Sequence, residues 1–318
     1  MFTNVVRSVA VTLLVSMAAS AQEDRGAAPA EPDATAAALH RLVRDTAAGG
    51  PTAFTATWQW SAAEIALRRP AAAPPPAEPM PQRANGSFAR DRLHVRFDEQ
   101  PSLELASFGR HLLLREGDGA FRIASQHTTA LAERPFALDP ELLLRALAAA
   151  APRVADRSIG ERDGEPIELF AVCLDAAQVA TLHFAGAIGD PNPISAAMRN
   201  LAERRGAAHA LPSATVDVAI EVDVASRRLR RVHVRVLTPQ VDSTRLRQIL
   251  GGRGAPDADD LESAPQEPTP TTFRDGLPVR ERGDRTLRFV EFCFRDHGVA
   301  ATGDVEQMEA AAAELLGR

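Results

Sequence analysis

The stretch from Ala214 to Leu237 constrains the fold more than any other part of the chain, because its apolar residues recur with the two-residue period of a β-strand. In residues 215–224 the apolar positions are Val216, Val218, Ile220, Val222 and Val224. After a polar break at residues 225–228, the same period resumes with Val232, Val234 and Val236. Two such runs joined by a short polar turn predict an antiparallel hairpin.

The opposite face of this hairpin is charged. It has acids on the first strand and bases on the second: Asp217, Glu221 and Asp223, then Arg231, His233 and Arg235. Opposite charges across a strand pair fix its register, so we expect ion pairs on a solvent-exposed face and a covered valine face. Acid–base catalysis or calcium binding is the alternative, but catalysis needs a carboxyl group in an apolar pocket, and these carboxyl groups face bases.

Residues 1–21 have the pattern of a secretory signal peptide, with a single Arg7, an apolar run and the small residues Ala19, Ser20 and Ala21 at a cleavage site. An uncleaved anchor is the alternative, but the run is shorter than the roughly 18 apolar residues that a membrane span needs. We therefore expect export to the periplasm or cell envelope, with no transmembrane anchor after cleavage. The formal charge of −6 argues against nucleic acid as a partner.

Composition divides the rest of the chain into one main domain with appended segments. Residues 22–32 form a polar linker, and residues 33–250 hold the predicted helices and strands of the domain. Residues 69–83 are proline-rich and predict a surface loop. Residues 251–272 are acidic with few large apolar residues, which predicts a flexible linker. Residues 273–318 are expected to add a C-terminal strand and helix that pack on the same domain.

Strand and helix patterns alternate in the main domain. Short apolar runs separated by turn residues from Gly86 to Ile123 predict an antiparallel meander. Helices are predicted to begin at Asp33 and at Asp139, where Pro140 occupies the first helical position. The pattern as a whole indicates an α+β fold built on an antiparallel sheet.

Two later segments differ in how clearly their sequences specify a structure. Residues 175–189 fit either a short helix, with a capping box formed by Asp175 and Gln178, or a strand. The run from Leu287 to Phe294 alternates in hydrophobicity and predicts a strand.

Motifs of metal, phosphate and nucleophile chemistry are missing from the sequence, which has no HExxH, CxxC, Gly-x-Ser-x-Gly or glycine-rich phosphate loop. We therefore predict no metal, no cofactor and no enzymatic activity; a hydrolase with a dispersed site is the remaining alternative. Cys173 and Cys293 both lie in strand-like runs. They form either a disulfide, as an exported protein allows, or two separately buried thiols.

Aromatic residues are scarce in this chain, yet Phe54, Trp58 and Trp60 share one face of a predicted strand near its start. Large aromatic side chains fill hydrophobic cores, and they also line apolar ligand cavities. The sequence leaves both roles open for this cluster.

The order of these elements resembles the exported lipoprotein-carrier superfamily, which includes LolA, mycobacterial lipid-binding lipoproteins and the sensor domain of RseB. The resemblance lies in the signal peptide, the first helix, the Phe54–Trp60 strand, Gly86-Ser-Phe88 opening the next strand, and the turns Phe108-Gly-Arg110 and Gly117-Asp-Gly119. It implies a curved antiparallel sheet, a half-barrel, wrapped over helices.

The same resemblance implies an apolar pocket for acyl chains. Its expected lining is Phe54, Trp58, Trp60, Leu93, Val95, Phe97, Leu103 and Leu105. The function that follows is a non-enzymatic exported protein that binds a lipid or a lipoprotein. An envelope sensor or interaction module of the same fold, with a protein partner and no ligand, is the alternative.

Overall fold

The computed structural model describes residues 34–60, 81–90, 92–98, 103–108, 111–123, 139–188, 204, 215–239, 273–274, 276–278, 284–297, 310 and 313–314. The chain divides into two compact units, residues 1–34 and 35–318. Every element below belongs to the second unit, apart from the first residue of helix α2.

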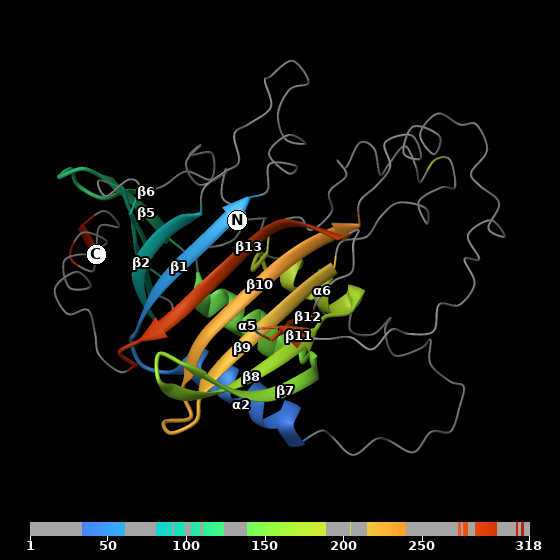
Figure 1. The fold of residues 1–318 in the computed structure, drawn as a ribbon. Coiled ribbons are helices and arrows are strands. Elements are labelled where there is room, and N and C mark those ends of the chain that lie inside the picture. Colours follow the sequence, from blue (N-terminus) through green and yellow to red (C-terminus); the bar gives the residue numbers. More distant parts are fainter. Residues whose placement is uncertain are drawn as a thin grey trace. The chain divides into compact units, whose positions relative to one another are not determined.

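An open sheet of eleven strands dominates this unit, and all of its neighbouring strands are antiparallel (Figure 1). The strands are β1 (Thr52–Trp60), β2 (Gln82–Ala89), β3 (Arg92–Phe97), β4 (Leu103–Phe108), β5 (His111–Glu116), β6 (Arg122–Ile123), β7 (Arg153–Arg162), β8 (Glu165–Cys173), β9 (Thr215–Asp223), β10 (Leu229–Pro239) and β13 (Asp284–Arg295). Their spatial order is β6-β5-β4-β3-β2-β1-β13-β10-β9-β8-β7. The predicted meander from β2 to β6 and the predicted hairpin of β9 and β10 are confirmed.

Strand β13 lies at the centre of the sheet, although it is the last of these strands in the chain. On one side Phe54 of β1 is opposite Phe294, and on the other side Val232 of β10 is opposite Phe292. The strand predicted from Leu287 to Phe294 is therefore the element that joins two groups of strands into one sheet.

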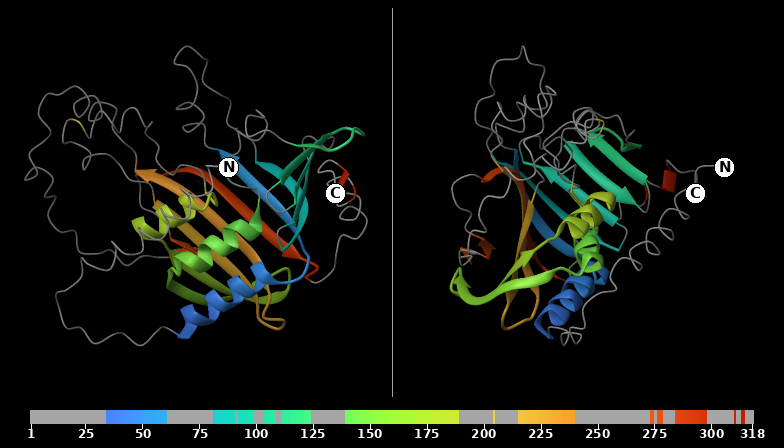
Figure 2. Two further views of the ribbon diagram at one scale, coloured as in Figure 1. Left: turned by 180° about the vertical axis from the view of Figure 1, so that it is seen from behind. Right: turned by 90° about the vertical axis from the view of Figure 1, so that its right-hand side faces the viewer.

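Three helices, α2 (Ala34–Ala48), α5 (Pro140–Ala150) and α6 (Ala176–Phe184), lie across one face of the sheet (Figure 2). We call this face the inner face and the opposite one the outer face. Asp139 caps α5 by accepting a hydrogen bond of 3.1 Å from the backbone N–H of Leu142. Asp175 and Gln178 form a complete capping box, so the ambiguous segment begins as a helix.

The hydrophobic core lies between these helices and the inner face. Each helix packs its apolar face into this core: Leu39, Val43 and Ala47 from α2, Leu143, Leu144 and Leu147 from α5, and Val179 and Leu182 from α6. The sheet contributes the valines of the opening hairpin, namely Val216, Val218, Val222, Val232, Val234 and Val236. The predicted α+β fold, an antiparallel sheet with helices packed against it, is confirmed.

A two-stranded ribbon, β11 (Phe273–Arg274) and β12 (Leu277–Pro278), lies on the outer face in front of β8 and β9 (Figure 1). Gly276 forms its turn with a φ of +71°, and a Cβ atom built on this glycine would lie 2.9 Å from the Leu169 side chain and 3.1 Å from Ala219 Cβ. The ribbon therefore contacts the sheet at its glycine, where a larger residue would not fit.

The expectation of a solvent-exposed charged face on the hairpin is wrong for its two central acids. Asp217 and Glu221 are each only 1% exposed, although both lie on the outer face. The ribbon turn docks at Ala219 between them, and arginine side chains from neighbouring strands lie over their carboxylates. Val224, expected on the valine face, lies instead in the turn and is 37% exposed.

Several predicted segments lie outside the described residues. They are the signal peptide and linker, residues 61–80 with most of the proline-rich segment, and residues 240–272 with the acidic linker. Of the predicted C-terminal helix, the structure describes residues 310 and 313–314.

Candidate functional site

The expected ligand-lining residues lie on the inner face of β1, β3 and β4. Phe54, Trp58, Leu93, Val95, Phe97, Leu103 and Leu105 are buried, with exposures between 0% and 5%. The eighth, Trp60, is opposite Arg288 in the sheet, and its side chain lies outside the description. The structure therefore brings the other seven predicted residues together in one apolar cluster, while their role in ligand binding stays a prediction.

Aromatic rings form the centre of this surface. Phe54 packs edge-on against Phe292 at a centroid distance of 5.7 Å and lies 6.2 Å from Phe88. Trp58 meets the Phe97 ring at 6.1 Å with an interplanar angle of 88°. Edge-to-face geometry of this kind fixes the rings, so the aromatic cluster stiffens the junction of β1, β3 and β13.

The helices do not extend over the whole inner face. Helix α5 contacts β2 and α6 contacts β9, while β4, β5 and β6 extend beyond all three described helices (Figure 2). Leu103 and Leu105 of β4 and Leu114 of β5 lie on this extension. Leu103 and Leu105 are each 5% exposed and Leu114 is 1% exposed, so all three side chains are buried.

One charged residue on the inner face was not singled out from the sequence. Arg288 of β13 is only 1% exposed, and it shares the face of Val290, Phe292 and Phe294 because it has the same parity along the strand. That parity is visible in the sequence and could have identified the residue. An arginine at an apolar strand position is costly to bury unless its charge is paired.

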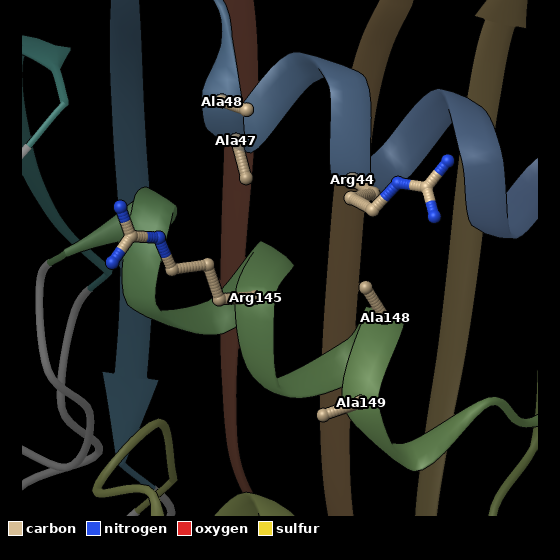
Figure 3. A pocket seen from close by; sticks show the side chains of 6 residues that line it. All are labelled: Arg44, Ala47, Ala48, Arg145, Ala148 and Ala149. Atoms are coloured by element: carbon tan, nitrogen blue, oxygen red, sulfur yellow. The ribbon is translucent and has the colours of Figure 1, made fainter.

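A groove with a volume of about 330 Å³ lies between α2 and α5 (Figure 3). Its lining consists of Arg44, Ala47, Ala48, Arg145, Ala148 and Ala149. The two guanidinium groups point away from each other, so alanine methyl groups line the space between them (Figure 3). Arg145 pairs with Glu141 and Arg44 lies 3.7 Å from Asp45. None of the predicted lining residues contributes to this groove.

The outer face carries an ion-pair network over β9, β10 and β13. Glu221 accepts hydrogen bonds from Arg231 and, at 2.8 Å, from Arg162. Arg231 also donates to Glu291 at 2.7 Å, and His233 Nδ1 lies 3.2 Å from the same carboxylate. The hydrogen bond from His233 and the charge of Arg231 lower the pKa of Glu291 to about 2, although partial burial opposes the shift.

A second network lies on the outer face of β3, β4 and β5. Burial raises the pKa of Glu104, but hydrogen bonds from His94 at 3.1 Å and from Arg115 outweigh burial and leave this pKa below its ordinary value. His94 is therefore buried against this carboxylate. In both networks arginines donate hydrogen bonds to the carboxylates, and neither network has a carboxyl group in an apolar pocket.

Both cysteines are free thiols. Cys173 of β8 and Cys293 of β13 are separated by β9 and β10, which places them at least about 14 Å apart at the usual strand spacing. A disulfide needs Cα atoms within about 7 Å, so the alternative of two separate thiols describes this structure. Cys173 is exposed rather than buried, whereas burial raises the pKa of Cys293 to about 11.

In the part of the chain that the structure describes, no three His, Cys, Asp or Glu side chains are grouped so that they could hold a metal ion. Within the same residues, no helix has the length and hydropathy to cross a membrane.

Comparison with known proteins gives little guidance. No family model matches the sequence, and no curated protein matches it. The crystal structure of the Mycobacterium tuberculosis lipoprotein LppX aligns with a TM-score of 0.38 and 6% identity, covering 86% of this chain and 99% of LppX. LprF from Mycobacterium bovis aligns with a TM-score of 0.37 and 9% identity, covering 85% and 96%. TM-scores this low do not establish a shared fold, so the resemblance to the lipoprotein-carrier superfamily stays a prediction.

Proposed function

We propose that this chain is an exported, non-enzymatic binding protein that holds a lipid or acylated group against the inner face of a half-barrel sheet. The signal-like pattern of residues 1–21 supports export to the periplasm or cell envelope. The single observation that carries the proposal is the apolar inner face of β4 and β5, which extends beyond the described helices.

The chemistry of this surface suits an acyl chain. Phe97, Leu103 and Leu105 present only hydrocarbon, and Trp58 borders them through its contact with Phe97. Burial of an acyl chain against such a surface gains about 0.8 kcal/mol for each CH₂ group removed from water. The outer face of β9, β10 and β13 carries ion pairs in place of a comparable apolar surface. We therefore assign the ligand to the inner face.

Quenching by brominated fatty acids tests the proposal directly, because the chain has two tryptophans, Trp58 and Trp60. Bromine on an acyl chain quenches an indole only at close range, so we expect saturable quenching in the folded protein and none in urea. The variants Trp58→Phe and Trp60→Phe each leave one reporter. A short water-soluble bromo acid is the control for collisional quenching.

Organic extraction of the purified protein, followed by mass spectrometry, gives an independent measurement. We expect a co-purifying lipid or acylated molecule in stoichiometric amount. Absence of both saturable quenching and co-purified lipid would refute the proposal. A stoichiometric envelope protein captured in place of lipid would support an interaction module of the same fold instead.

A further inference from the structure

Strand β7 is the last strand at one edge of the sheet, so within the described part of the chain it pairs with β8 alone (Figure 1). It is ten residues long, whereas β6 at the opposite edge has two residues. Ile159 of this strand is 77% exposed, although it is a large apolar side chain. A long edge strand with an exposed isoleucine is a surface to which the strand of another chain can add.

The β7–β8 turn determines which backbone groups of β7 point toward the edge. Asp163 and Gly164 have φ values of 53° and 81°, as in a two-residue type I′ turn, and the flanking residues Arg162 and Glu165 are opposite each other. Residues that flank such a turn form a hydrogen-bonded pair, and hydrogen-bonded pairs alternate along an antiparallel ladder. The residues whose backbone N–H and C=O groups point away from β8 are therefore Arg157, Ile159 and Glu161.

The charges of β7 are complementary to those of a second β7 in one antiparallel register. When Ile159 of one copy is opposite Ile159 of the other, Arg157 is opposite Glu161. In the same register Asp156 is opposite Arg162, and the edge-directed backbone groups of both copies face each other. A shift of two residues in either direction breaks both charge pairs. A shift of four places Arg157 or Glu161 opposite its own equivalent.

The side chains of this pattern are accessible to a second copy. Within the described residues, neither the Asp156 nor the Glu161 carboxylate takes part in an ion pair. Arg157 and Arg162 each bind one buried glutamate of their own chain, yet their side chains stay 52% and 38% exposed. A guanidinium has five N–H donors, so each arginine can also bind a carboxylate of a second copy. Exposed ion pairs add little affinity, so they select the register while backbone hydrogen bonds hold the strands together.

We propose that β7 pairs with β7 of a second copy of this chain, in the antiparallel register centred on Ile159, to form a symmetric dimer. The two-fold axis passes between the two Ile159 residues and is perpendicular to the sheet, so the inner faces of both copies lie on the same side of one continuous sheet. The paired segment, residues 156–162, is short, so we expect a weak dimer whose population depends on protein concentration. This inference does not depend on the proposed lipid binding.

Sedimentation equilibrium of the purified protein over a range of concentrations tests the dimer. We expect a reversible equilibrium between monomer and dimer in the unchanged protein. Glu161→Arg places like charges opposite each other at two symmetric positions, so it should raise the Kd of the dimer at least about tenfold. Asp118→Arg is the matched control, because it makes the same charge change in an exposed turn between β5 and β6 and should leave the Kd unchanged.

A mixture of two variants tests which charges face each other. Arg157→Glu should weaken the dimer by itself, as Glu161→Arg does. In an equimolar mixture of the two proteins, each changed charge faces an opposite charge on the other chain, so the mixture should recover the dimer. Urea unfolding of each variant establishes that it is folded, since Arg157→Glu also removes an ion pair with Glu168.

Disulfide cross-linking measures the register independently, even if Arg157→Glu fails to fold. In a background of Cys173→Ser and Cys293→Ala, Ile159→Cys should give an intermolecular disulfide on oxidation, because Cα atoms of a hydrogen-bonded pair lie about 5.5 Å apart. Ala155→Cys is the matched control, because residue 155 is exposed on the same strand but lies about 27 Å from its equivalent in this register. It should give no cross-link.

Four outcomes would overturn the proposal. The first is a monomer at every concentration. The second is a dimer that Glu161→Arg leaves unchanged or weakens no more than Asp118→Arg does, which would place the contact away from β7. The third is a mixture of folded Arg157→Glu and Glu161→Arg proteins that stays monomeric. The fourth is cross-linking at residue 155 equal to that at residue 159, which would show random collision in place of the register centred on Ile159.

Discussion

The inner face depends at one point on the absence of a side chain. Gly86 of β2 is opposite Phe54 of β1, and the Phe54 ring lies over the glycine. A Cβ atom built on Gly86 would lie 2.7 Å from the Phe54 ring and 2.3 Å from the carbonyl oxygen of His94. The glycine is therefore required by the close approach of an aromatic ring and a neighbouring backbone.

Substitution of this glycine should disturb the aromatic cluster. We expect Gly86→Ala to lower the free energy of unfolding by about 2 kcal/mol, because the extra methyl group overpacks a buried site. Urea unfolding gives the measurement. Gly160→Ala in β7 is the matched control, since the nearest atom to its added Cβ is 3.8 Å away, and its effect should stay within about 0.5 kcal/mol. Equal losses in both variants would contradict the role of the ring contact.

Glu291 should make the stability of the protein sensitive to acid. Its pKa in the folded protein is about 2, compared with an ordinary value of 4.5, because His233 and Arg231 bind the ionised form. This contribution is fully present above pH 4.5 and is lost as the pH falls from 4.5 toward 2.

We expect Glu291→Gln to cost about 2 kcal/mol at neutral pH, as loss of a charged hydrogen bond does. The variant should also lose less stability than the unchanged protein between pH 4.5 and pH 2. Thermal unfolding across that range measures both effects. An acid limb as steep in the variant as in the unchanged protein would show that other carboxylates control the transition.

At the scale of elements, the β11–β12 ribbon protects the buried acids of β9. Its turn docks between Leu169 of β8 and Ala219 of β9, and Ala219 lies between Asp217 and Glu221 in the strand. Because the ribbon adds no strand to the sheet, its attachment depends on side-chain packing at that turn. Gly276 is the residue whose size permits the contact.

Gly276→Ala should detach the ribbon. The change costs about 1 kcal/mol for a side chain at positive φ and about 1–2 kcal/mol more for the contact with Leu169 and Ala219. Gly164→Ala in the β7–β8 turn is the control, because it also has a positive φ but no atom within 4 Å of the added Cβ. Hydrogen exchange of the ribbon amides should accelerate only in Gly276→Ala; equal acceleration in the control would contradict the docking contact.

At the scale of the whole molecule, local patterns predicted the strands and helices well, because each element follows its own periodicity and capping residues. Alternation predicted the β9–β10 hairpin, and the charge pairs Glu221–Arg231 and Asp217–Arg235 lie directly opposite each other, as expected. The central position of β13 was not predictable in this way. Its pairing of Phe54 with Phe294 joins residues at opposite ends of the domain, and no local pattern encodes such a contact.

The candidate site shows the same division. Alternation correctly assigned Phe54 and Trp58 to a buried face, but it could not say how far the helices would cover that face. Burial of Asp217 and Glu221 was missed, because the covering ribbon comes from residues 273–278, far along the chain. Arg288 was not singled out either, although its parity along β13 places it on the inner face with Val290 and Phe292.

The position of β13 predicts how the whole sheet forms. The β1–β6 group and the β7–β10 group are connected in the sheet only through β13. The two groups therefore cannot form one sheet before β13 is present. A chain truncated after Gly283 should therefore lose cooperative urea unfolding, and a peptide of residues 284–297 added in trans should restore it by pairing with β1 and β10. A chain that ends at His297 keeps every strand that the structure describes and should unfold cooperatively without the peptide. A truncated chain with an unchanged urea midpoint would contradict the central role of β13, because the two groups would then be stable without the strand that joins them.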